Sequence, residues 1–270
     1  MPNAVPGAPF ELLVEWAHEA EGGPFSSVGV VDRVVYECHD PLDSLAAAAE
    51  ATSRIGLVTM VVIGPLRDDA ELAAQAAAIH ASSAGRLTLG LAVGARTEDY
   101  AAKGISPVGR GERLAEQLLE LRLRWEKDGI GGPPLLVGGG SDASLLRMAR
   151  YADGYVHGGG PPRAFVRAAD GARTAWSELD RPGTPQLWGQ GYFALGDAAT
   201  VERGRDYMRD YYAFTGPFAE RIAEGMLATP QAVAQFVRGY AEAGCDELVL
   251  FPAVADLHQI DRLAGALAEA

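Results

Sequence analysis

Cysteine and lysine are both scarce in this sequence. Its 270 residues contain only Cys38 and Cys245, which lie far apart and exclude a disulfide framework of the secreted kind. Lysine occurs only at Lys103 and Lys127, so nearly all of the positive charge comes from arginine. We therefore expect a protein of the reducing cytoplasm.

Long apolar runs and a secretion signal are also missing. No apolar stretch reaches the roughly 20 residues that a membrane-spanning helix needs. The Met1–Pro6 segment has neither a basic start nor an apolar core, so we expect no signal peptide. The formal net charge of −13 should repel nucleic acid and anionic membranes, and an anionic ligand would therefore need a local site.

Motifs for metal binding and for nucleophilic hydrolysis are absent from the sequence as well. The five histidines are scattered, and no CxxC, HExxH or GxSxG pattern occurs. This absence favours chemistry that is carried by a bound cofactor.

The sequence does contain a regular alternation of short apolar runs with Ala-rich amphipathic segments. Seven runs are predicted strands: Ser27–Val31, Ile55–Ile63, Arg86–Val93, Pro134–Val137, Gly154–His157, Gln186–Leu195 and Glu247–Phe251. Strands that alternate with helices predict a parallel sheet with both faces covered. Because the length fits and no linker interrupts the pattern, we predict one α/β domain over residues 1–270, a (β/α)8 TIM barrel.

The first strand of such a barrel is not evident. Only Met1–Ala8 precedes the first predicted helix, and Pro2, Pro6 and Gly7 make that stretch a poor strand. We expect a first strand that is short, irregular or missing, or a barrel that a partner completes.

The best ligand signal is the Gly138–Ser141 turn, which follows a predicted strand and opens a predicted helix. Active sites of parallel barrels lie at the carboxyl ends of their strands. The turn's N–H groups and the hydroxyls of Ser141 and Ser144 suit a phosphate, although a flexible turn with Ser141 as a simple N-cap fits the pattern as well. Arg110 would add positive charge there, or lie on a solvated surface.

Four further side chains at strand ends are candidates for substrate polarisation or proton transfer: Asp32, Arg33, His39 and His157. A simpler interpretation is that Asp32 and Arg33 pair with each other or with their loop. His157 has a simpler reading as a packing residue.

Several segments, taken in their order along the chain, resemble those of a known family. They are Asp40-Pro41-Leu42, Arg54 to Leu57, Pro65-Leu66-Arg67, Ser83 to Leu91, Arg110-Gly111-x-Arg113, Leu136 to Gly139, Ala149 to Gly154 and Ala243 to Leu248. With these segments the chain resembles the luciferase-like monooxygenase family, which comprises flavin- and deazaflavin-dependent oxidoreductases. The resemblance runs from Ala17 to Leu248 and implies a (β/α)8 barrel with a cofactor ring across its mouth.

The resemblance also implies which residues contact the cofactor. They are Met60, Val61, Val62, Gly94, Ala95, Arg110, Gly138, Gly139, Gly140, Ser141 and Ser144. The Met60–Val61 peptide bond is implied to be cis and to lie behind the ring, and the phosphate to lie on the glycine turn. The implied cofactor is coenzyme F420, a deazaflavin, with FMN as the alternative. The implied partners are a small-molecule substrate, a flavin or F420 reductase, and a second copy in a homodimer.

Two positions depart from the family pattern. Asp32-Arg33 stands where many deazaflavin-dependent members have Asp-His, and Ala95 stands where the sugar-phosphate dehydrogenases have a carboxylate. We therefore expect no sugar-phosphate substrate. The expected function is that of a cofactor-dependent oxidoreductase or monooxygenase acting on a small organic substrate. The alternative is a non-catalytic flavin-binding or partner-completing barrel subunit.

Overall fold

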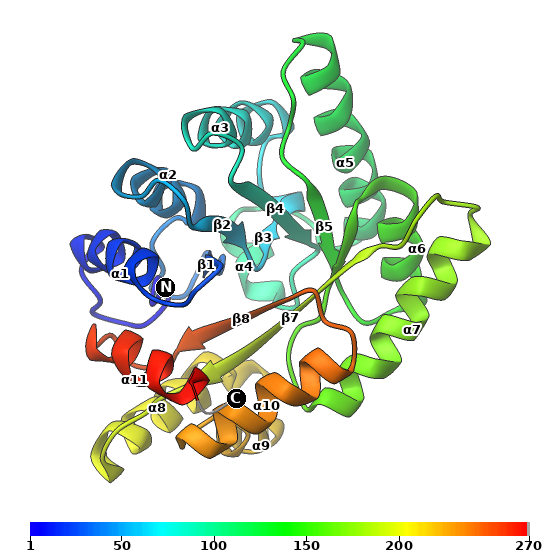
Figure 1. Ribbon diagram of the computed structural model, residues 1–270. Coiled ribbons are helices and arrows are strands. Elements are labelled where there is room, and N and C mark those ends of the chain that lie inside the picture. Colours follow the sequence, from blue (N-terminus) through cyan, green and yellow to red (C-terminus); the bar gives the residue numbers. More distant parts are fainter. Residues whose placement is uncertain (269–270) are drawn as a thin grey trace.

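The predicted alternation of strands and helices is present in the computed structural model, which describes residues 1–268 (Figure 1). The strands are β1 (Ser27–Val30), β2 (Gly56–Thr59), β3 (Val62–Ile63), β4 (Leu87–Ala92), β5 (Leu135–Gly138), β6 (Gly154–Val156), β7 (Gln186–Phe193) and β8 (Glu247–Pro252). They pair in parallel in the order β1-β2-β4-β5-β6-β7-β8, and β3 pairs with β4. The result is the predicted parallel barrel, nearly closed.

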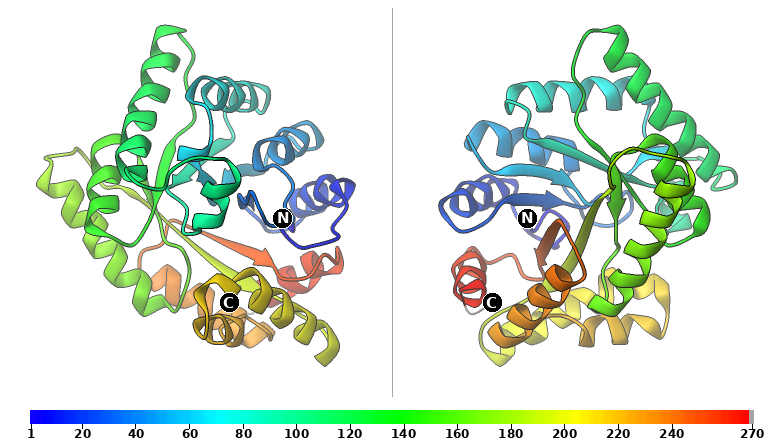
Figure 2. Two further views of the ribbon diagram at one scale, coloured as in Figure 1. Left: turned by 180° about the vertical axis from the view of Figure 1, so that it is seen from behind. Right: turned by 45° about the vertical axis from the view of Figure 1, so that its right-hand side comes forward.

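Helices cover the outside of the strands (Figure 2). They are α1 (Phe10–Gly22), α2 (Pro41–Ala51), α3 (Asp69–Ser82), α4 (Thr97–Ala102), α5 (Arg110–Lys127), α6 (Asp142–Tyr151), α7 (Pro162–Glu178), α8 (Ala198–Tyr211), α9 (Phe218–Glu224), α10 (Pro230–Glu242) and α11 (His258–Leu267), with short 3-10 turns at Gly64–Leu66 and Ala213–Thr215. The helical segment that follows β7 is divided between α8 and α9. Gly216, with a φ of 60°, separates these two helices, because only glycine adopts that backbone readily. Within residues 1–268, no helix is both long and apolar enough to cross a membrane.

The predicted strand Ile55–Ile63 is interrupted between β2 and β3. The peptide bond between Met60 and Val61 is cis, which is what the resemblance implied for this position. Beside the interruption, the Thr59 hydroxyl donates to the Gly90 carbonyl and accepts from the Gly90 N–H, each at 2.8 Å. A Cβ on Gly90 would lie 2.2 Å from the Thr59 carbonyl oxygen, so this close approach of β2 and β4 requires a glycine.

Residues 1–8 form turns and no strand, in agreement with the expectation of an irregular or missing first strand. The terminal ammonium of Met1 donates to the Gly29 carbonyl at 2.6 Å. The Asn3 carboxamide donates to the Val31 carbonyl at 2.7 Å and accepts from the Val31 N–H at 3.1 Å. The side chain of Asn3 therefore makes the two hydrogen bonds that a neighbouring strand would otherwise make with Val31.

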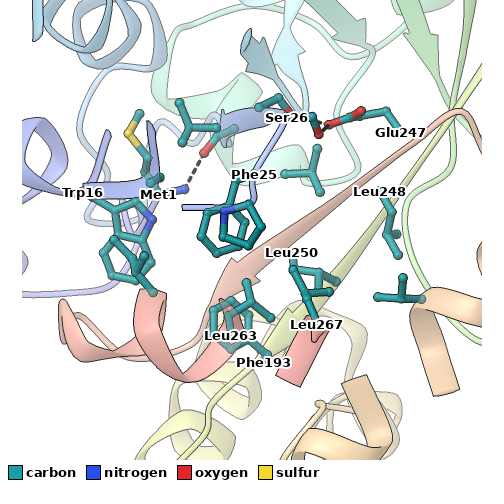
Figure 3. Close-up of a pocket in the computed structure, with 18 residues that line it drawn as sticks. Met1, Trp16, Phe25, Ser26, Phe193, Glu247, Leu248, Leu250, Leu263 and Leu267 are labelled. Carbon is teal, nitrogen blue, oxygen red and sulfur yellow. Dashed lines mark hydrogen bonds between the residues drawn. The ribbon is translucent and has the colours of Figure 1, made fainter. Parts of the chain in front are cut away.

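Between β1 and β8 lies a mostly apolar cavity of about 140 Å³ (Figure 3). It is lined by Trp16 from α1, by Phe25 from the loop between α1 and β1, and by Leu263 from α11. Across its upper edge, the Ser26 and Ser27 hydroxyls donate to one carboxylate oxygen of Glu247, at 2.6 and 2.5 Å. Side chains, rather than a ladder of backbone hydrogen bonds, thus hold this seam of the barrel together.

Candidate functional site

The candidate site is a cavity of about 870 Å³ at the carboxyl ends of the strands. It is lined by Met60, Val61, Ala92, Val93, Gly94, Ala95, Gly138, Gly139, Gly140, Asp142, Leu145, Tyr155, Val156, His157, Gly158, Gly159, Ala164, Arg167, Ala168, Gly171 and Gln190. The cis bond and the glycine turn, which are far apart in sequence, therefore open into one space. Below it, the barrel interior is filled by apolar side chains that include Val58, Leu136 and Phe251.

The glycine turn is held rigidly while one of its faces stays open. The Ser141 hydroxyl accepts from the Ser144 N–H at 3.3 Å, and the Ser144 hydroxyl accepts from the Ser141 N–H at 3.0 Å, which together form a capping box at the start of α6. The buried Tyr155 hydroxyl donates to the Gly139 carbonyl at 2.9 Å. A Cβ on Gly140 would meet no atom within 4 Å, so a ligand can approach the backbone there closely.

Of the residues implied to contact the cofactor, four are not among those that line the cavity: Val62, Arg110, Ser141 and Ser144. The Ser144 side chain is 4% exposed, and its hydroxyl also donates to the Ser141 carbonyl at 2.6 Å. Val62 is fully buried in the core. Arg110 does not line the cavity; its guanidinium carbon lies 5.8 Å from the centre of the Tyr100 ring. The basic side chain that does line the cavity is Arg167 on α7.

Asp32 lies outside the cavity, in a buried ion pair. Arg67 donates to its two carboxylate oxygens at 3.0 and 3.2 Å, and the Ile63 N–H donates at 2.9 Å. Burial raises the pKa of the Asp32 carboxyl, and the bonds from Arg67 oppose that rise. Asp32 thus holds the segment after the cis bond in place.

Arg33 is paired in the same manner. Its Nε donates to Asp99 at 3.0 Å, and Asp99 also accepts from the N–H groups of Val34 and Val35. The Arg33 guanidinium lies 5.3 Å from the centre of the Tyr211 ring, a cation–π distance. These contacts tie the loop after β1 to α4 and α8.

His39 and His157 have different surroundings. His39 lies beside the N-terminal turns, where its Nε2 is 2.7 Å from the Ala8 carbonyl oxygen. His157 lines the cavity and packs edge-on against Phe165 of α7, with ring centres 5.8 Å apart. Burial lowers the pKa of His157 below its usual 6.5, so the imidazole is neutral at pH 7. Of the four candidates for acid–base work, the structure brings only His157 to the cavity.

Comparison with known proteins identifies the family. A family model described as luciferase-like monooxygenase matches residues 2–243. The chain belongs to the luciferase-like monooxygenase family. The uncharacterized protein Rv0940c of Mycobacterium tuberculosis is 32% identical over 203 residues, which cover 58% of this chain and 69% of that protein. A second uncharacterized protein of that organism, Rv0953c, is 29% identical over 171 residues, or 55% of this chain and 60% of the relative.

Solved structures of low identity share the fold of this luciferase-like chain. An F420-dependent secondary alcohol dehydrogenase, in complex with an F420–acetone adduct, superposes with a TM-score of 0.78 at 16% identity, covering 94% of both chains. The monooxygenase RslO1 from Streptomyces bottropensis gives 0.75 at 21% identity, covering 96% of this chain and 92% of that one. EDTA monooxygenase from Chelativorans sp. BNC1 gives 0.73 at 17% identity, covering 96% and 86%.

The polar residues Asp142, Arg167 and Gln190 of this luciferase-like site were not singled out from the sequence. Arg167 had no signal beyond its place on a helix face. Gln190 had one: it alternates with Trp188 and Tyr192 in a predicted strand, which puts it on the inner face. It is 7% exposed, and its Oε1 is buried without a hydrogen-bond partner among residues 1–268. An open glycine backbone at one wall and an unpaired buried acceptor at another fit a cofactor with a phosphate and a polar ring.

Proposed function

We propose that this chain is an oxidoreductase that binds a flavin-type cofactor in the 870 Å³ cavity and acts on a small organic substrate. One observation carries the proposal: the Gly138–Gly140 turn and the Met60–Val61 bond line the same cavity. A glycine backbone at the start of α6 suits an anionic group, since the first turn of a helix presents N–H groups and the helix dipole favours negative charge. Met60, Val61 and Val156 add apolar residues to the cavity lining, against which a ring can pack.

Coenzyme F420 is the cofactor we propose first, with FMN as the alternative. The cavity continues past the glycine turn between α6 and α7, where Leu145, Ala168 and Gly171 line it. That extension suits a cofactor whose chain continues beyond its phosphate, as in F420. When bound, F420 supplies a hydride at its ring, whereas reduced FMN supports chemistry with oxygen. The chain's own residues bind and orient the ring and shield it from water.

A second candidate function is a barrel subunit that binds the cofactor without catalysis. The observation that favours it is the pairing of Asp32 with Arg67 and of Arg33 with Asp99, which leaves these groups outside the cavity. His157 alone of the predicted candidates remains beside the ligand space.

The test is a binding titration with F420 and with FMN, followed by turnover assays. Gly140→Asp should raise the dissociation constant for the bound cofactor at least tenfold, since the new carboxylate meets the phosphate in space that is otherwise open. Gly131→Asp is the matched control, because a Cβ there also meets no atom within 4 Å and the residue lies outside the cavity. It should leave binding unchanged.

Each outcome separates the candidates. Binding with turnover supports the oxidoreductase, and binding without turnover of any substrate tested supports the non-catalytic subunit. If the folded wild type binds neither F420 nor FMN, the cofactor proposal is wrong.

A further inference from the structure

The inner face of β7 places one carboxamide among apolar side chains. Gln190 shares that face with Trp188 and Tyr192, and Val156 lies on the neighbouring strand β6. The polar atoms of the two flanking residues have partners: the Trp188 indole N–H donates to Gln186, and the Tyr192 hydroxyl accepts from Tyr212. Gln190 is therefore the residue of this face whose hydrogen bonding is incomplete.

The orientation of that carboxamide is fixed by a backbone contact. Nε2 of Gln190 donates to the Gly158 carbonyl oxygen at 3.1 Å. A flipped amide would place two carbonyl oxygens against each other, so the nitrogen must face Gly158. Oε1 is then the atom that remains, buried and without a donor among residues 1–268. Leaving a buried acceptor unpaired is unfavourable, and an apolar side chain of similar size would avoid that cost.

We propose that Gln190 is a specificity-determining residue that accepts a hydrogen bond from an imide N–H of the cofactor ring. This inference rests on the proposed function and names the part of the cofactor that Gln190 recognises. Flavins and deazaflavins share a pyrimidinedione edge in which one N–H lies between two carbonyl groups. A carboxamide presents an acceptor beside a donor, and Nε2 keeps a second hydrogen after its bond to Gly158. The two edges are therefore complementary.

The test compares FMN with 3-methyl-FMN, in which a methyl group replaces the imide hydrogen. The corresponding pair of 8-hydroxy-5-deazaflavins serves if FMN itself does not bind. Fluorescence quenching gives the dissociation constants without any need for turnover. Methylation should weaken binding to the wild type by about tenfold or more, because it removes a donor and leaves the acceptor buried and unpaired.

The matched variant is Gln190→Leu, which keeps a similar volume and removes the acceptor. It should bind the parent flavin about tenfold more weakly than the wild type does, and it should bind the two flavins within a factor of about two of each other. Its thermal unfolding is measured alongside, since the variant also loses the bond to Gly158. The comparison of two ligands on the wild type stands even if the variant does not fold.

The outcomes keep this inference apart from the proposed function. A wild type that binds no member of either pair overturns the proposed function. A wild type that binds the parent and methylated rings equally well keeps a cofactor in the cavity but overturns the role of Gln190. A Gln190→Leu protein that folds and still discriminates against the methylated ring also overturns it.

Discussion

Substituting Gly139 by alanine should destabilise the protein far more than the same substitution at the next residue. Gly139 has a φ of 137°, a region that residues with a Cβ rarely adopt. A Cβ at this position would also lie 2.8 Å from both the Cβ and the Oγ of Ser144. Because Ser144 Cβ is fixed to the backbone of α6, the start of the helix has to shift.

The expected magnitude follows from these two effects. Holding an alanine in so sparsely populated a backbone region costs about 1–3 kcal/mol. Displacing Ser144 breaks its reciprocal bonds with Ser141, and losing such a cap costs about 1 kcal/mol. Gly139→Ala should therefore lower the free energy of unfolding by about 2–4 kcal/mol.

Gly140→Ala is the matched control. Its φ lies outside the left-handed region, and an added Cβ meets no atom within 4 Å. We expect a change within about 0.5 kcal/mol. Urea unfolding followed by circular dichroism measures both variants. If the two variants unfold at the same urea concentration as the wild type, the reasoning about the turn is refuted.

Two further predictions concern the missing strand and the cavity histidine. Asn3→Ala should lower the free energy of unfolding by about 2–4 kcal/mol, since it removes two hydrogen bonds to the buried Val31. The Val31 N–H loses its side-chain acceptor, and the Val31 carbonyl keeps only the weaker bond from the Cys38 thiol, at 3.6 Å. A loss under about 0.5 kcal/mol in urea unfolding would contradict this role. For His157, whose pKa burial lowers, the unfolded state takes up a proton more readily, so stability should fall as pH drops below 6.5. His157→Phe should lose less stability than the wild type between pH 7.5 and 5.5, and parallel losses would show that another group is responsible.

The alternation of strands and helices could be predicted from the sequence, because each strand and each helix has its own hydrophobic periodicity. The position of the glycine turn was readable for the same reason, since Ser141 caps a helix that directly follows a strand. The break after Thr59 was not readable from periodicity, because the residues from Ile55 to Ile63 form one apolar run. Only the resemblance to a family pointed to a cis bond there.

The pairing of charges was beyond what the sequence predicts. Arg67 binds Asp32 from 35 positions away, and Asp99 binds Arg33 from 66 positions away. Neighbouring Asp32 and Arg33 lie beyond the end of β1 and bind different partners, a choice that no local pattern indicates. Asn3 is a similar case, because the role of its side chain depends on the absence of a strand beside Val31.

These pairings change how the site must be understood. Asp32 and Arg33 were predicted as catalytic candidates at a strand end, but each forms an ion pair with a residue far along the chain and fixes a loop at the barrel mouth. The groups left at the cavity are a neutral imidazole, a carboxamide, Arg167 and Asp142 among glycine backbones and apolar side chains. Such a lining binds and orients a ligand well but offers little proton chemistry of its own. In this family member, we therefore expect the bound cofactor to determine the reaction, and the loops held by Asp32 and Asp99 to determine which substrate reaches it.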